Sequence, residues 1–368
     1  MMVIGGGAVL GQSVYEGFEA RLMHPLELTP DGARLVAVHG EAGSLSVFDV
    51  TGAGMMPVKV REVPVGLEPV TVRARTSDEV WVVNEVSDSV SVVSLGAGAV
   101  VGVVPVGDEP ADVVFAGGKA FVSCARDNEV WVFDATTRAL LAQVAVEGLY
   151  PQSLAVSGDG GRVFAVCLHS GNGTTVLKRQ VAPPQPGPTN GVLPEGPDTA
   201  LIVPASDSRV PYTVLDHDVA VIDVVTHAVT GYRGGVGTNL LGAAMRPGVD
   251  ELWVSNTEAL NTVRFEPELK GNFARNRLSV VNGLTGGVTV HDLNPGVDYE
   301  VLPNVAAQAV ALAQPTAMVF EGDGAALWVA AFASDRVAKV DAATGAVVGR
   351  VDVRPAGGDS GVMRGPRG

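Results

Sequence analysis

The chain of 368 residues is poor in cysteine, in aromatic residues and in positive charge. Its two cysteines, Cys124 and Cys167, are too few for a disulfide-stabilised scaffold. Acidic residues outnumber Lys and Arg by 40 to 25, so the net charge is −15, which argues against nucleic acid or anionic lipid as partners. No apolar run is long enough for a membrane-spanning helix. The apolar residues 1–10 also lack the basic region of a signal peptide.

The sequence also lacks the short motifs of common hydrolases, because neither Gly-x-Ser-x-Gly nor His-Glu-x-x-His occurs in it. The glycine-rich segment from Gly5 to Gly11 looks superficially like a dinucleotide-binding loop. Such a loop needs a following βαβ unit, and the next strands belong to a repeat instead. These absences favour a binding protein over an enzyme of a familiar class.

What the chain has in abundance is Val, 46 Gly and 23 Pro, arranged in a repeat. A unit that begins with Gly-x-x-Pro or a close variant returns about every 41 to 44 residues. Each unit contains four short apolar stretches separated by turns, which is typical of one blade of a β-propeller. The units enter at Pro25, Pro69, Pro110 and Pro151, with degenerate copies at Gly242 and Pro315 and a fragment at Pro366.

The second unit shows the pattern most clearly. Its four expected strands are Val70–Arg73, Val80–Asn84, Val90–Val93 and Val100–Val106. We therefore predict an all-β propeller with six complete blades in this chain and seven in the intact protein. Residues 1–12 are expected to be an extension, and residues 13–368 the propeller, cut short at the start of the seventh blade. Residues 13–22 are predicted to form an outer strand of that seventh blade.

The fourth and fifth units are interrupted at the same place, between their second and third strands. The predicted insertions are residues 173–215, rich in Pro and Gly, and residues 257–276. Long loops in a compact domain are commonly functional or disordered. Because the strands run alternately up and down, both insertions are expected on one face, side by side, where they would form a cap.

The same face is expected to carry the residue before each entry proline and the residue that ends each second strand. Side chains at these positions are candidates for binding, together with those that flank the first insertion. The candidates are His24, Glu68, Glu109 and Tyr150 at the entries, Asp112 just beyond one of them, His39, Asn84 and Asn256 at the strand ends, and His169, Asp216, His217 and Asp218 beside the insertion.

Several of these residue types suggest metal chemistry. Glu27, Thr71, Asp112 and Ser153 each follow an entry proline by two residues and are expected to point into the central channel, with Glu68 and Glu109 at its mouth. Such carboxylates could hold Ca²⁺ through oxygen ligands. The alternative is an ordinary wet, polar channel, which the absence of an Asp-x-Asp-x-Asp loop favours.

Two smaller groups have a chemical and a structural interpretation. Cys124 and Cys167 with His39 could bind a soft metal, but without a Cys-x-x-Cys pair they are better explained as buried apolar residues. Asp216-His217-Asp218 could orient a general base. The same residues also suit hydrogen bonding at a turn or strand end, which is the more common role.

The segments Val80–Asn84 and Leu252–Asn256, with the Gly-x-x-Pro entries, resemble the YVTN-type β-propeller repeat. Further stretches look like one bacterial subgroup of exported proteins, in which a seven-bladed propeller precedes a C-terminal c-type haem domain. They are Phe164–Thr175, Pro197–Val203, Asp216–Val219, Asn256–Asn261 and Asp292–Pro295. The resemblance implies a periplasmic or extracellular location and a haem c held downstream by Cys-x-x-Cys-His. This chain lacks that motif, so it is expected to bind no haem itself.

Three functions follow as hypotheses. The first is a non-enzymatic scaffold that docks a redox domain, or another protein, on the insertion face through Tyr150, Phe265 and the two insertions. The second is a metal-assisted, lactonase-like hydrolase with Glu68, Glu109 and Asp112 as ligands and His24 or His39 as base. The third is a structural surface or adhesion propeller. The sequence does not identify a small-molecule ligand.

Overall fold

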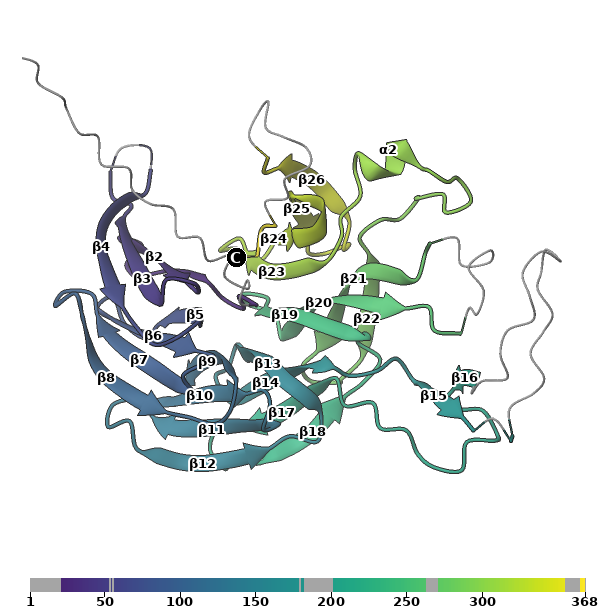
Figure 1. Ribbon diagram of the computed structural model, residues 1–368, viewed down its shortest axis with the longest axis horizontal. Helices are drawn as coiled ribbons and strands as arrows, with labels where there is room; N and C mark the ends of the chain where they lie inside the picture. The colour runs from purple at the N-terminus through teal and green to yellow at the C-terminus, as the bar shows by residue number, and fades with distance from the viewer. Residues whose placement is uncertain are drawn as a thin grey trace, which may run out of the picture.

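The computed structural model describes residues 21–52, 54, 56–178, 180–181, 201–262, 271–354 and 365–367. Four-stranded antiparallel blades stand side by side in an arc around a central axis, with the first strand of each blade innermost (Figure 1). The sheets of blades 4 and 5 are joined by pairing of His169 with Asn239. The predicted β-propeller fold and its blades are confirmed.

The strands of the first three blades follow the repeat without interruption. Blade 1 contains β1 (Leu26–Leu28), β2 (Arg34–His39), β3 (Ser44–Asp49) and β4 (Val58–Pro64). Blade 2 contains β5 (Pro69–Ala74), β6 (Glu79–Asn84), β7 (Ser89–Ser94) and β8 (Ala99–Pro105). Blade 3 contains β9 (Pro110–Ala116), β10 (Lys119–Cys124), β11 (Glu129–Asp134) and β12 (Leu140–Ala145).

The last three blades contain the interruptions. Blade 4 contains β13 (Leu149–Val156), β14 (Arg162–His169), β17 (Val219–Asp223) and β18 (Val229–Arg233), with the extra hairpin β15 (Thr174–Leu177) and β16 (Leu201–Pro204) between β14 and β17. Blade 5 contains β19 (Asn239–Met245), β20 (Glu251–Ala259), β21 (Ala274–Asn282) and β22 (Val288–Asp292). Blade 6 contains β23 (Pro315–Phe320), β24 (Ala326–Ala331), β25 (Arg336–Asp341) and β26 (Val347–Asp352), with the short helices α2 (Val305–Gln308) before it and η2 (Phe332–Ser334) within it.

The hydrophobic cores lie between blades, because successive side chains of a strand face opposite sides of its sheet. On β6, Val80 and Val82 pack against blade 1, whereas Trp81 and Val83 pack against blade 3. Five clusters of buried apolar side chains are arranged in this way, one between each pair of consecutive blades. Valine-rich middle strands such as β6 and β7 are therefore buried on both faces, whereas the outer strand β8 exposes Val101 and Val103.

Blades 1 and 6 are separated by a groove instead of a core of this kind, as far as the described residues show. The groove has a volume of about 410 Å³ and is lined by Leu26, Leu28 and Leu35 on one side and Trp328, Ala330 and Val337 on the other. Of the predicted outer strand 13–22, only Arg21 and Leu22 are described, and Leu22 packs against the core between blades 1 and 2. The predicted extension 1–12 lies outside the described residues.

The turn that enters an inner strand has an unusual backbone in four blades. The residue before the entry proline has a positive φ, of 50° at Glu68, 49° at Glu109, 63° at Tyr150 and 49° at Gln314. Residues with a Cβ rarely adopt this left-handed conformation. A register shift follows each of these turns, between Pro69 and Thr71 in blade 2 for example. The repeat therefore encodes a fixed entry geometry.

Candidate functional site

The insertion face, which carries the entry turns and both insertions, gathers several of the predicted residues at the inner ends of blades 2 to 4. The Tyr150 hydroxyl donates a hydrogen bond to Glu109 Oε2, and Arg126 Nη1 contacts Glu109 Oε1 at 3.0 Å. The bond from Tyr150 and the Arg126 charge lower the pKa of Glu109 despite its partial burial. Glu109 is thus committed to two protein partners and is not free as a metal ligand.

Three glutamates, Glu68, Glu85 and Glu109, form an acidic mouth at this end of the channel. Burial raises the pKa of Glu85, and the nearby Glu109 and Glu68 raise it further, while Arg21 opposes the shift. Sequence reasoning missed Glu85, although it directly follows Asn84 at the end of a second strand. The acidic mouth therefore gathers three carboxylates, with Arg21 and Arg126 beside them, where blades 2 and 3 meet.

The residues beside the first insertion have structural partners. The His169 ring packs edge-on against Tyr150, with 5.7 Å between ring centroids. Asp216 Oδ2 accepts from the amide of Gly235 at 2.8 Å, and Asp218 Oδ2 accepts from the amide of Val236 at 2.5 Å. The His217 ring stacks on Tyr232, with a centroid separation of 3.8 Å. The two aspartates thus hold the turn between blades 4 and 5, and no Asp–His pair is formed among these three residues.

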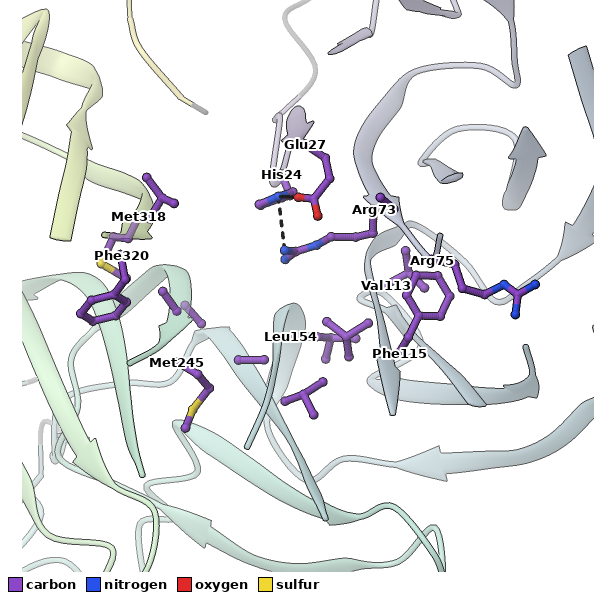
Figure 2. A pocket seen from close by; sticks show the side chains of 17 residues that line it. His24, Glu27, Arg73, Arg75, Val113, Phe115, Leu154, Met245, Met318 and Phe320 are labelled. Carbon is purple, nitrogen blue, oxygen red and sulfur yellow. Dashed lines mark hydrogen bonds and ion pairs between the residues drawn. The ribbon is translucent and has the colours of Figure 1, made fainter. Parts of the chain in front are cut away.

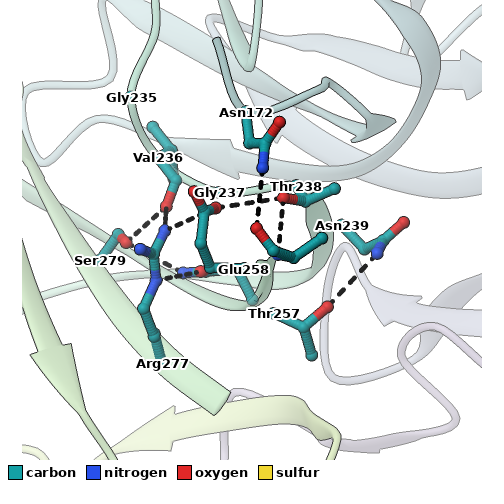
Figure 3. Close-up of polar contacts among 12 residues, drawn as sticks. Asn172, Gly235, Val236, Gly237, Thr238, Asn239, Thr257, Glu258, Arg277 and Ser279 are labelled. Carbon is teal, nitrogen blue, oxygen red and sulfur yellow. Dashed lines mark hydrogen bonds and ion pairs between the residues drawn. The ribbon is translucent and has the colours of Figure 1, made fainter. Parts of the chain in front are cut away.

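A polar network connects that turn to the second insertion (Figure 3). Arg277 Nη2 contacts Glu258 Oε2 at 3.1 Å and the Val236 carbonyl at 3.0 Å. Thr238 Oγ1 donates to Glu258 Oε2 at 3.1 Å. Burial raises the pKa of Glu258, and the Arg277 charge opposes this shift. The network fixes the extended ends of β20 and β21 against blade 4.

The bases of the two insertions are in direct contact. Asn172 Nδ2 donates to the Ala259 carbonyl at 2.8 Å, and Asn261 Nδ2 donates to Asn172 Oδ1 at 3.0 Å and to Thr174 Oγ1 at 3.1 Å. Phe265 and much of both predicted insertions lie outside the described residues. Figure 1 shows β15 and β16 projecting from the arc on the side of blades 4 and 5.

The predicted residues at the ends of second strands are buried or bonded locally. Asn84 accepts from the Gly66 amide at 3.1 Å and so braces the entry turn of blade 2, whereas Asn256 donates at 2.9 Å to Ser279 on the neighbouring strand β21. His39 Nε2 lies 2.9 Å from Ser46 Oγ. Cys124 and Cys167 lie in two different interblade cores. Within the described ranges, no three His, Cys, Asp or Glu side chains gather as a metal-binding group.

The predicted channel positions need a correction. Thr71, Asp112 and Ser153 are buried between neighbouring inner strands and do not line an open channel. Thr71 Oγ1, for example, donates to the Ala111 carbonyl of the next blade at 2.7 Å. The physical reason is the bulge at the entry turns of blades 2, 3 and 4, because an extra residue there rotates the side chains that follow. Glu27 alone of the four faces the axis.

A central pocket of about 500 Å³ lies instead at the other ends of the inner strands, away from the insertions (Figure 2). One wall is polar and is formed by His24, Glu27 and Arg73, while Met245, Met318 and Phe320 lie across from it. His24, predicted at the insertion face, thus belongs to this pocket. Arg73 was not predicted, although it lies two residues after Thr71 on the same alternating strand.

The polar wall is anchored by an ion pair between blades 2 and 3. Arg73 donates from Nε to Asp112 Oδ1 at 3.2 Å and from Nη2 to Oδ2 at 3.0 Å. Burial lowers the pKa of Arg73, but the charge and hydrogen bonds of Asp112 outweigh it, so the net shift is upward. His24 Nε2 lies 2.6 Å from Glu27 Oε2 and 3.3 Å from Arg73 Nη1. Arg73 therefore remains charged inside the pocket.

No protein-family model and no curated protein matches the sequence. Among solved structures, the chain is similar to hydrazine synthase of Kuenenia stuttgartiensis, with a TM-score of 0.66 and 19% identity over 91% of this chain and 80% of that one. It is also similar to a candidate 6-phosphogluconolactonase of Bacteroides fragilis, with a TM-score of 0.55 and 14% identity over 91% and 86%. At these identities the likeness shows the fold alone. The chain is a β-propeller, and the YVTN-type subgroup with its haem domain stays a prediction from the repeat sequence.

Proposed function

We propose that this propeller is a non-enzymatic binding module whose insertion face docks a basic protein, in particular a c-type cytochrome domain. The observation that carries the proposal is the acidic mouth on the same face as two insertions whose bases are hydrogen-bonded to each other, linked to them through the contacts of Tyr150 with Glu109 and His169. Opposite charge across an interface speeds encounter and fixes orientation. The insertions would supply further partner contacts at the edge of this face.

Exposed apolar side chains on the insertions support this role. Tyr212 is 55% exposed and Phe273 69%, and Val176 on the projecting hairpin is 55% exposed. Aromatic anchors surrounded by polar groups are typical of the energetically dominant part of a protein interface. The acidic mouth would thus steer the partner, and the insertions would retain it.

The test uses surface plasmon resonance to measure the binding of a purified basic c-type cytochrome to the chain, at low and at physiological salt concentration. The variant Glu68→Gln/Glu85→Gln/Glu109→Gln should weaken binding by about tenfold and flatten the salt dependence. A matched control, Asp31→Asn/Asp159→Asn/Asp323→Asn, removes the same charge from turns at the opposite ends of the inner strands and should change affinity less than about twofold. Equal effects of the two variants, or no binding at low salt, would refute the proposal.

A lactonase is the second candidate, which the likeness to the Bacteroides fragilis structure favours. Its predicted ligands do not converge, because Asp112 is buried against Arg73 and Glu109 is held by Tyr150 and Arg126. A lactonase would therefore have to use His24 in the central pocket. Turnover of 6-phosphogluconolactone above the buffer rate, lost in His24→Ala, would replace the docking proposal.

A further inference from the structure

The central pocket has an apolar side and a charged side, and this separation suggests the class of ligand that it binds. Leu154, Met245 and Met318 are among the apolar side chains that line it. All its charge is concentrated on one side, in Glu27 and Arg73 with His24 between them, apart from Arg75, which is bound to Glu79. Ligand pockets commonly combine an apolar surface with a few placed polar groups.

Among the described residues, the hydrogen bonds of Arg73 leave one of its N–H donors available for a ligand. Its Nε and Nη2 are used by Asp112, and Nη1 carries two hydrogens, of which at most one can point at His24. The 2.6 Å contact between His24 Nε2 and Glu27 Oε2 places a hydrogen between the two atoms, so the Nε2 position is fully used by Glu27. His24 Nε2 then cannot accept from Arg73. Among the described residues, Arg73 Nη1 has no other acceptor within hydrogen-bonding distance.

The charges in the wall restrict the ligand. Arg73 and Asp112 neutralise each other, and the Glu27 carboxylate that faces the pocket disfavours a simple anion. A simple cation would be repelled by the Arg73 guanidinium. An uncharged apolar molecule would leave both groups desolvated without partners, which costs free energy. A molecule with one positive and one negative group satisfies both.

The spacing also suits such a molecule. Arg73 Nη1 and Glu27 Oε2 are at most about 5.9 Å apart, because they lie 3.3 Å and 2.6 Å from the same His24 nitrogen. The ammonium nitrogen and carboxylate oxygens of an α-amino acid are about 3 Å apart, so a ligand placed to one side of the line between the two groups can reach both with hydrogen bonds of about 2.8 Å. The side chain would then extend toward Leu154, Met245 and Met318.

We propose that the central pocket binds a small zwitterion with an apolar side chain, of the class of aliphatic α-amino acids. The carboxylate contacts Arg73 Nη1, and the ammonium group contacts Glu27. This site is independent of the proposed docking function, because it lies at the opposite ends of the inner strands from the insertions.

The test is isothermal titration calorimetry with three isosteric probes. L-Leucine carries both charges, 4-methylpentanoate lacks the ammonium group, and 3-methylbutylamine lacks the carboxylate. We expect leucine to bind and each analogue to bind at least about tenfold more weakly, since each forfeits one charged hydrogen-bonding partner. Glu27→Gln should weaken leucine binding by about tenfold while leaving 4-methylpentanoate no weaker than before.

Two further variants separate binding from folding. Glu68→Gln removes the same charge at the acidic mouth and should leave leucine binding unchanged. Met318→Trp fills the pocket without altering its charges and should abolish binding, with circular dichroism confirming that the variant is folded. The proposal is overturned if 4-methylpentanoate binds wild type as well as leucine does, if Glu27→Gln and Met318→Trp leave leucine binding intact, or if leucine gives no heat up to about 10 mM.

Discussion

Replacing Asp112 by Ala should destabilise the junction of three inner strands. Asp112 is 1% exposed, and its carboxylate accepts four hydrogen bonds. Arg73 of β5 supplies two of them, Val113 of β9 one at 2.8 Å, and Leu154 of β13 one at 3.0 Å. One side chain thus connects blades 2, 3 and 4, and its loss leaves Arg73 without its counter-ion.

The expected cost follows from these contacts. Removing one partner of a buried ion pair typically costs about 3–5 kcal/mol, because the remaining charge stays uncompensated. The Arg73 side chain is 21% exposed, so water relieves part of this penalty. The orphaned Leu154 amide adds a contribution of its own, about 1 kcal/mol or more. We therefore expect Asp112→Ala to lower the free energy of unfolding by about 3 kcal/mol.

The measurement is urea unfolding followed by far-ultraviolet circular dichroism and by tryptophan fluorescence. Both probes are needed, because a repeat array can unfold in parts, and a free energy is defined only where their transitions coincide. The double variant Arg73→Met/Asp112→Leu removes both charges and should be less destabilised than the sum of its single variants. A loss below about 1 kcal/mol for Asp112→Ala, or simple additivity in the double variant, would refute the reasoning.

Three other predictions concern separate parts of the fold. Burial raises the pKa of Cys124 and of Cys167 to about 12, so neither thiol should react with Ellman's reagent at about pH 8 until the chain is unfolded. Burial and the neighbouring Asp216 raise the pKa of Asp218 to about 7, so the folded chain retains a proton that the unfolded chain has released. Stability should therefore fall as the pH rises from about 4 to 7, and Asp218→Asn should reduce the loss seen between urea unfolding at about pH 5 and at about pH 8. A Cβ on Gly242 would lie 2.7 Å from the Thr316 carbonyl, so Gly242→Ala should cost about 1–3 kcal/mol in thermal unfolding. Gly158→Ala, where a Cβ meets nothing within 4 Å, is its control.

The blades could be predicted from sequence because their signal is local. Alternating valines and the entry prolines mark each strand, and the predicted strand Val80–Asn84 differs from β6 by one residue. Alternation also explains Asp216-His217-Asp218 in retrospect. Consecutive residues of an extended chain point to opposite sides. The two aspartates therefore share the turn, and His217 stacks on Tyr232.

The pocket could not be predicted, because it depends on contacts between blades. Arg73 and Asp112 are separated by 39 residues, and their pairing requires the lateral register of β5 and β9. That register follows the bulges at the entry turns, which the hydrophobic pattern does not reveal. The same bulges turn the side chains of Thr71, Asp112 and Ser153 away from the axis. The prediction that side chains two residues after an entry proline point into the channel is therefore wrong for these three residues.

The positive φ before four entry prolines is a backbone feature that recurs while the exposed side chain at the same position varies. The backbone angle recurs while the side chain differs, with Glu in blades 2 and 3, Tyr in blade 4 and Gln in blade 6. Each of these residues bears a conformational strain on the order of 1 kcal/mol that a glycine would relieve. None of the four belongs to an interblade core. The entry position of a blade can consequently take different residues while the fold of the blade stays the same, so neighbouring positions such as Glu109 and Tyr150 can form contacts with each other without any change in the strands.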